Sequence, residues 1–218
     1  LPPGNYGVAA ARQGVPYEGN GPKPVIHPIA VAEGGTVEQN FALPATGRVR
    51  VQVADADDNP LPARIGVVGF DPSPEVIFPG SDTTGLFYDQ KEALHFGFTH
   101  VDYTDAEGVA EFDLEPGDYQ IAVSRGTEYS LFTQNVTVTP GAPVEVSAHI
   151  AKVIDSDGFV SSDFHVHGIA SADSRIPESD RVRQFAGEGV DNIIMTDHHA
   201  HTDLTRTILR LGFKRWVH

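Results

Sequence analysis

The sequence predicts a mainly β protein in which antiparallel β-sandwich structure is followed by a shorter segment of alternating strands and helices. Two observations support this prediction. Short runs of alternating or β-branched residues recur between turn clusters as far as residue 154, and strand-like and helix-like runs alternate after Asp155. The 218 residues suit one large or two modest domains, and a hydrophobic fraction of 40 % is enough for a buried core.

Six strands are expected in the first part of the chain. Turn clusters separate them, and the Glu115–Asp118 cluster contains Pro and Gly, whose backbone preferences suit a reversal of the chain. Several short strands at this spacing are typical of a sandwich of antiparallel strands. The expected strands are Arg48–Val53, Arg64–Phe70, Val109–Leu114, Tyr119–Val123, Leu131–Val138 and Val144–Ile150.

After Asp155 the expected elements begin with a strand over Gly158–His167. A helix over Asp180–Glu188 follows, with Ser179 as its N-cap residue and Gly189 just after its end. Polar N-caps and glycines at the C-terminus are common because they satisfy the unpaired backbone groups at helix ends.

The next expected strand, Asn192–Thr196, is of the buried type. Thr202 or Asp203 would cap a second helix that Gly212 stops, and Lys214–Val217 would open a third strand. This β-α-β-α-β order is typical of a parallel sheet or barrel.

Two segments near the N-terminus repeat later in the chain. Leu1–Ala10 shares a Leu-x-Pro-Gly-x-Tyr pattern with Leu114–Val123, and Ile29–Val37 parallels Val136–Val144. We expect residues 1–45 to be the last strands of a truncated module whose complete copy is residues 46–154. Leu1 would then lie inside a longer parent chain. The alternative is that two unrelated hairpins have similar sequences.

The complete copy also carries an Asp-Asn-Pro-Leu-Pro-Ala segment at Asp58–Ala63 and an Asp-x-x-Gly turn at Asp105–Gly108. On these residues and the Leu-x-Pro-Gly-x-Tyr pattern, it resembles the carboxypeptidase-regulatory-like, or prealbumin-like, β-sandwich module. The resemblance implies an accessory role in spacing, docking or adhesion. Residues 71–103 form an aromatic-rich insertion, which is either a loop packed on its neighbours or a lid or partner surface.

Five of the ten histidines lie between residues 165 and 201, in two groups at the ends of predicted strands. Alternation along a strand places His165 and His167 on the same side, where two imidazoles can bind one metal. Asp173, in the following loop, offers a carboxylate ligand. The second group contains Asp197, His198, His199 and His201.

These residues form one ordered pattern: Asp-Phe-His-Val-His, then Ser-x-Asp-Ser, then a helix, then Thr-Asp-His. The pattern resembles the opening of the PHP (polymerase and histidinol phosphatase) metallohydrolase domain. It covers residues 158–218, which would form the first βα units of a distorted (β/α)7 barrel. Residues 155–218 would thus be an incomplete N-terminal part of that domain. The Gly189–His198 segment resembles the carbaryl-hydrolase-like branch of the superfamily.

The resemblance implies a role for each polar residue of the two groups. His165 and His167 match the paired ligands of one metal, and Asp173 and His198 match ligands of a neighbouring metal. Asp163 and Asp197 match acidic positions that orient the imidazole rings. His199 and His201 have no assured family role and are either additional ligands, substrate contacts or solvated loop residues. These assignments rest on the motif positions in the sequence.

The implied cofactors are divalent metals, two or three Zn, Mn or Fe ions in the complete parent domain. The implied reaction is the hydrolysis of a small-molecule phosphoester, carbamate or ester by a metal-activated hydroxide. The later ligands of the family, a Glu, further His residues and an Asp-x-His, have no place before His218. The isolated chain is therefore expected to be poorly active or inactive.

The alternative function is a secreted structural, adhesive or filament-forming β-sandwich protein with a vestigial PHP segment. Such a protein would self-associate through the edges of the incomplete barrel. Export to the periplasm or the exterior fits either reading and follows from the resemblance to tandem prealbumin-like modules. The Leu-Pro-Pro-Gly start itself has no signal-peptide character.

Composition excludes several other classes of function. The formal net charge of −15 argues against nucleic-acid partners, because phosphate binding requires excess positive charge. The absence of Cys excludes disulfides, thiolate zinc sites and a Cys nucleophile. No apolar run approaches the ~20 residues that a membrane-spanning helix needs.

Overall fold

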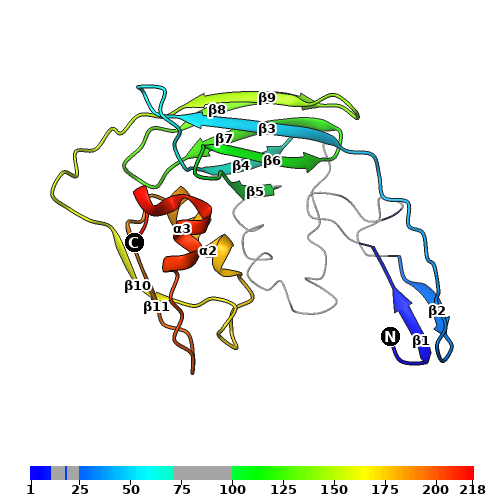
Figure 1. The fold of residues 1–218 in the computed structure, drawn as a ribbon. Helices are drawn as coiled ribbons and strands as arrows, with labels where there is room; N and C mark the ends of the chain where they lie inside the picture. The colour runs from blue at the N-terminus through cyan, green and yellow to red at the C-terminus, as the bar shows by residue number, and fades with distance from the viewer. Residues whose placement is uncertain (11–17, 19–24, 71–99) are drawn as a thin grey trace.

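The computed structural model describes residues 1–10, 18, 25–70 and 100–218, and this part of the chain is mainly β structure (Figure 1). A hairpin of β1 and β2 comes first, then a sandwich, then a small parallel sheet with two helices. The hairpin and sandwich strands are β1 (Gly4–Val8), β2 (His27–Val31), β3 (Gly47–Ala54), β4 (Arg64–Gly69), β5 (His100–Tyr103), β6 (Val109–Leu114), β7 (Gly117–Ser124), β8 (Phe132–Val138) and β9 (Val144–His149).

The sandwich consists of a three-stranded sheet, β6-β3-β9, and a four-stranded sheet, β5-β4-β7-β8. Alternation along each strand directs apolar side chains into the space between the sheets, where Val51, Ile65 and Ile121 are fully buried. All six expected strands are present. One pair differs from the expected antiparallel pattern, since β3 and β9 are parallel. The chain crosses between the two sheets before β9 returns beside β3.

β5 was not expected, because its four residues lie inside the predicted insertion and show no clear alternation. It pairs antiparallel with β4 at the edge of the four-stranded sheet. The aromatic-rich remainder of the insertion, residues 71–99, lies outside the described residues. Both interpretations of that segment, packed loop or lid, therefore stay predictions.

The two repeated segments form antiparallel strand pairs with the same register. β1 pairs with β2 so that Gly4 lies opposite Val31, and β7 pairs with β8 so that Gly117 lies opposite Val138. In the sequence repeat, Gly4 corresponds to Gly117 and Val31 corresponds to Val138. The strand register therefore repeats together with the sequence.

A tyrosine contact repeats as well. The hydroxyl of Tyr119 donates to the backbone oxygen of Glu115 at 2.8 Å, and the hydroxyl of Tyr6 donates to that of Pro2 at 2.6 Å. Tyr119 is fully buried in the core of the sandwich. Burial raises the pKa of Tyr119 to about 12, and the nearby Glu115 carboxylate adds to the shift. A shared register and a shared side-chain contact favour a genuine repeat over two unrelated hairpins.

The C-terminal unit alternates strand and helix: β10 (Ser162–Val166), α2 (Glu178–Gly187), β11 (Asn192–Met195), α3 (Thr205–Leu211) and the 3-10 turn η2 (Phe213–Arg215). β10 and β11 are parallel, as the alternation predicts. Val166, Val182, Ile193 and Phe213 form the centre of a second hydrophobic core between this sheet and the helices. No helix of the described residues is long and apolar enough to cross a membrane.

α2 begins two residues before the expected start at Asp180 and ends one residue before the expected end at Glu188. The helix begins at Glu178 after Pro177, whose backbone oxygen accepts the N–H groups of Asp180 and Arg181. Ser179 therefore lies in the first turn, and its hydroxyl donates to the Asp180 carboxylate instead of capping the helix. Gly189 follows the helix with a φ of +73°, in agreement with the expected C-terminal glycine.

The segment after α3 also departs from expectation. Gly212 ends α3 with a φ of +80°, as predicted, but Lys214–Val217 does not open a strand. Residues 213–215 form η2, because this turn brings Phe213 and Val217 into the second core. From this segment, His218 forms backbone hydrogen bonds at the start of β11: its N–H donates to the Asp191 oxygen at 2.7 Å, and its own oxygen accepts the Ile193 N–H at 3.0 Å.

Arg125, just after β7, joins the sandwich to the C-terminal unit. Its guanidinium donates to the Pro62 backbone oxygen at 2.7 Å and to the Ala186 oxygen near the end of α2. The same group lies 5.1 Å from the centre of the Trp216 ring. Arg125 is buried, and burial lowers the pKa of its guanidinium. Arg125 is thus a buried cation between the sandwich and the C-terminal unit, beside Trp216, which packs against both cores.

Gly108→Ala is expected to lower the free energy of unfolding by about 2–4 kcal/mol, through left-handed backbone strain and a steric clash. Gly108 closes the Asp105–Gly108 turn with a φ of +73°, and a Cβ there would lie 2.3 Å from the Val53 backbone oxygen. Gly141→Ala is the matched control, because Gly141 has a φ of +78° and open space around it. Urea denaturation measures both. Equal losses would show that the clash contributes nothing.

Candidate metal centre

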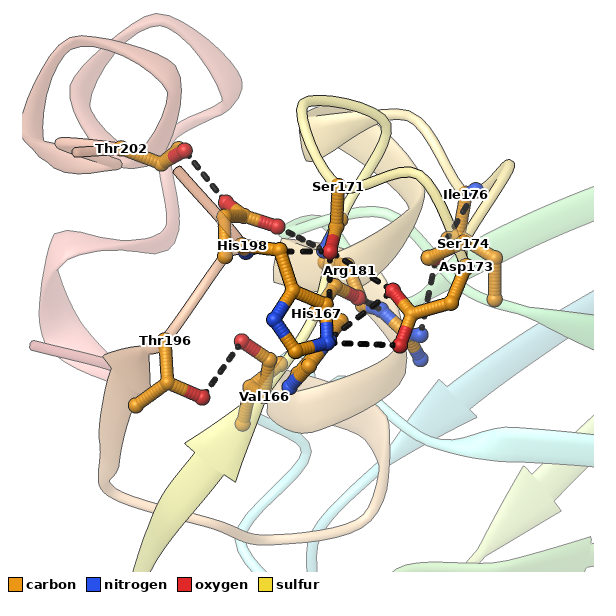
Figure 2. A network of polar contacts seen from close by, with 12 residues as sticks. Val166, His167, Ser171, Asp173, Ser174, Ile176, Arg181, Thr196, His198 and Thr202 are labelled. Atoms are coloured by element: carbon orange, nitrogen blue, oxygen red, sulfur yellow. Dashed lines mark hydrogen bonds and ion pairs between the residues drawn. The ribbon is translucent and has the colours of Figure 1, made fainter. Parts of the chain in front are cut away.

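Two parallel strands bring the two histidine groups together. His167 follows β10 and His198 follows β11 by three residues, so both lie at the carboxyl edge of the same small sheet. The Thr196 N–H donates to the Val166 oxygen at 2.7 Å and keeps the two strand ends in register. Figure 2 shows the two rings facing the loop that carries Asp173.

His167, Asp173 and His198 form a group whose possible ligand atoms all lie within 4.8 Å of one another. Asp173 lies between the rings: Oδ1 is 3.0 Å from Nδ1 of His167, and Oδ2 is 3.2 Å from Nε2 of His198. The ring centres of the two histidines are 4.7 Å apart. Three segments of the chain therefore converge on one point.

The carboxylate of Asp173 is held in its ionised form. Hydrogen bonds from the Ser171 hydroxyl, at 2.6 Å, and from His167 keep the pKa of Asp173 well below its usual range. A negative charge between two imidazoles favours the binding of a cation. The His198 and Asp173 side chains are 56 % and 53 % exposed, so the group is accessible from solvent.

Asp197 is buried beneath the group and connects two parts of its backbone. One oxygen accepts the Gly168 N–H at 2.7 Å, and the other accepts the Thr202 hydroxyl. Burial opposes the ionisation of Asp197, but these hydrogen bonds outweigh it and lower the pKa. Asp197, which directly precedes His198, thus holds Gly168, the residue after His167, close to the second histidine group.

The two acidic residues contact the local backbone, and the ring-orienting role that the family resemblance implies stays a prediction. In the described part of the chain, Asp197 contacts a backbone N–H and a hydroxyl, and Asp163 accepts the backbone N–H of His165 at 3.0 Å. Neither carboxylate is hydrogen-bonded to an imidazole ring there. Short carboxylates after or within a strand reach the local backbone first.

The remaining histidines lie outside the group of three. The His165 ring is 4.9 Å from the His167 ring, centre to centre, so the two are close, as strand alternation predicts. The His199 ring is 6.4 Å from that of His198, and His199 has a positive φ of +57°. His201 is exposed in the following loop. The structure groups His167 with Asp173 and His198 instead of with His165.

Two polar residues of the site had no predicted role. The buried Ser171 contacts all three members of the group through its hydroxyl. Arg181 of α2 donates from Nε to the His167 backbone oxygen at 2.8 Å and fixes the end of β10. Nothing in the residue spacing predicts either contact, although Ser171 belongs to the Ser-x-Asp-Ser motif.

The residues present fit a divalent metal ion. Two imidazole nitrogens and one carboxylate oxygen are the ligand types that Zn, Mn and Fe take in proteins. Three protein ligands at an exposed site leave further coordination positions for water or substrate. The donor types and their accessibility agree with a catalytic kind of site better than with a closed structural one.

Comparisons with known proteins show no family for this chain. No protein-family model matches it, and no curated protein matches its sequence. Among solved structures, a streptococcal ancillary pilin has a TM-score of 0.36 and 17 % identity, over 70 % of this chain and 46 % of its own. BcpA, the major pilin subunit of Bacillus cereus, has a TM-score of 0.35 and 16 % identity, over 57 % and 37 %.

One solved structure with a similar TM-score is an enzyme. The 3-chlorocatechol 1,2-dioxygenase from Rhodococcus opacus has a TM-score of 0.34 and 11 % identity, over 50 % of this chain and 61 % of its own. The chain spans less than half the length of the pilins. These likenesses are too low to define a family or a function.

Proposed function

We propose that this chain binds a divalent metal ion through His167, Asp173 and His198 and forms the first two βα units of a PHP-type metal-dependent hydrolase. The observation that supports this is the convergence of the three donors at the ends of two parallel strands. Zn, Mn and Fe suit the donor set equally. His165, whose ring centre is 4.9 Å from that of His167, would take part in binding a second ion.

The chemistry that such an ion supplies when bound is a hydroxide formed from water at neutral pH, for attack on a phosphoester, carbamate or ester. The protein's own contribution is positional. Asp173 supplies negative charge between the rings, and Asp197 and Arg181 fix the backbone on either side of His167. The exposure of His198 and Asp173 leaves room for a small-molecule substrate.

Only three donors converge in the described residues, fewer than a centre of two or three ions requires. Hydrolysis by the chain alone is therefore expected to be weak or absent. Metal binding, which needs no further residues, is the property to test first.

The second candidate function is an exported structural or adhesive β-sandwich protein that self-associates. The observation that favours it is a set of exposed apolar side chains on and beside β10: Phe159, Val160 and Phe164 are 82 %, 73 % and 73 % exposed. Large exposed apolar side chains close together in the sequence favour a surface that contacts another chain. The β-sandwich itself suits either function.

A cobalt titration distinguishes the two functions. The purified chain, stripped of metal, is expected to bind about one Co²⁺ per chain and to develop the visible absorption of a low-symmetry nitrogen–oxygen site. Sedimentation of the same sample measures self-association. A chain that binds no Co²⁺ would contradict the proposed hydrolase centre. Metal-independent oligomers together with that result would support the second candidate.

A further inference from the structure

Ser171 lies at the centre of the three-residue group, although its side chain is not one of the expected ligands (Figure 2). Its hydroxyl donates to Oδ1 of Asp173 at 2.6 Å and lies 3.2 Å from Nδ1 of His167. It also accepts the backbone N–H of His198 at 3.1 Å. One buried oxygen atom therefore contacts every member of the group.

These contacts use the full hydrogen-bonding capacity of the hydroxyl. A serine hydroxyl has one hydrogen and two lone pairs, and here the hydrogen is directed to Asp173. One lone pair accepts the His198 N–H, and the other faces His167. Because Ser171 is only 3 % exposed, water cannot easily replace it if the hydroxyl is removed.

The backbone fixes Ser171 in this position. Its N–H donates to the Gly168 oxygen at 2.9 Å, and its own backbone oxygen accepts the Ser174 N–H at 3.4 Å. The loop after His167 thus forms two tight turns that place the Ser171 hydroxyl within hydrogen-bonding distance of all three residues. Asp173 and His198, by contrast, have half-exposed side chains, and Ser171 contacts the carboxylate of the first and the backbone N–H of the second.

We propose that Ser171 is a positioning residue that orders Asp173 and His198 around His167 and thereby sets the affinity of the group for a divalent ion. This inference rests on the metal-binding function proposed above. The physical reason is that ligands already held in place lose less conformational entropy when an ion binds. Residues that orient metal ligands typically change affinity by about 10- to 100-fold when they are removed.

Ser171→Ala is expected to weaken Co²⁺ binding by about 10-fold or more and to change the visible spectrum of the bound ion. Ser174→Ala is the matched control, since Ser174 is equally buried in the same loop. Its hydroxyl contacts the Ile176 N–H and Arg181 instead of the ligands. Its affinity for Co²⁺ is expected to stay near that of the unmodified chain. Equal affinities for both variants would overturn the proposal.

A second measurement needs no metal. In the metal-free chain, Ser171→Ala is expected to speed hydrogen exchange of the His198 amide, measured by NMR, because that N–H loses its acceptor. Unchanged exchange would show that Ser171 does not order His198 and would overturn the proposal. If the unmodified chain binds no Co²⁺, the metal-binding function fails and this inference fails with it. If it binds Co²⁺ and Ser171→Ala binds equally well, only the role of Ser171 fails.

Discussion

Arg125→Ala is expected to lower the free energy of unfolding by about 3 kcal/mol, through lost hydrogen bonds and lost packing. The change leaves the backbone oxygens of Pro62 and Ala186 without their buried donor. It also opens space beside Trp216, whose ring lies against the guanidinium. Urea denaturation followed by circular dichroism measures the loss. A separate early transition of the C-terminal unit would show that Arg125 couples it to the sandwich.

Arg48→Ala is the matched control for this prediction. Arg48 also belongs to the sandwich and forms ion pairs with Glu111 and Asp113, but its side chain is 56 % exposed. Exposed ion pairs contribute about 0–1 kcal/mol, because solvent screens them. If Arg48→Ala destabilised the protein as much as Arg125→Ala, burial would not be the reason for the effect.

His167→Ala is expected to weaken Co²⁺ or Zn²⁺ binding by at least about 100-fold, since it removes one of only three protein ligands. Asp173 and Ser171 contact the His167 ring, and the Arg181 side chain donates to the His167 backbone oxygen, so His167 is held at three points. Competition against a chromophoric chelator measures the affinity. The fold is expected to remain, because the His167 side chain lies outside the second core.

Two further variants sharpen the assignment. His149→Ala removes an exposed histidine that pairs with Asp58 at 2.8 Å on the sandwich, and it should leave metal affinity unchanged. His165→Ala should weaken the binding of the ion at His167, Asp173 and His198 by less than about 10-fold. That is the lower end of the effect of removing a residue that contacts a metal ligand without binding the metal. If His165→Ala matched His167→Ala, the pairing implied by the family resemblance would hold and the group of three would be wrong.

Elements with regular alternation could be predicted closely from the sequence. The Val109–Leu114 strand has the predicted bounds, because buried apolar residues alternate in it with polar residues that are exposed or half-buried. β5 escaped prediction because a short edge strand gains its structure from pairing with β4, which leaves no local pattern. The turn at residues 213–215 escaped because burial of Phe213 and Val217 outweighs the strand preference of the segment.

The composition of the candidate site and the pairing of Asp173 with His198 could be predicted from the sequence, whereas the addition of His167 to that pair could not. The sequence places histidines at two strand ends, and parallel pairing then brings them together. The rule that alternate residues share a side assumes a regular strand, whereas the register of β10 against β11 shifts between Asp163 and Val166. His165 and His167 still lie close together, and the loop that carries Asp173 completes the group of three by placing its carboxylate between His167 and His198.

The sequence by itself determined the β-rich first part, the alternating strand and helix after it, and a histidine-rich site of nitrogen and oxygen donors. These features follow from side-chain type and local periodicity. Only the tertiary structure decided that His167 joins Asp173 and His198, that Ser171 lies beneath them and that Arg125 connects the two cores. Those contacts join segments far apart in the chain, so they depend on how strands pair and helices pack.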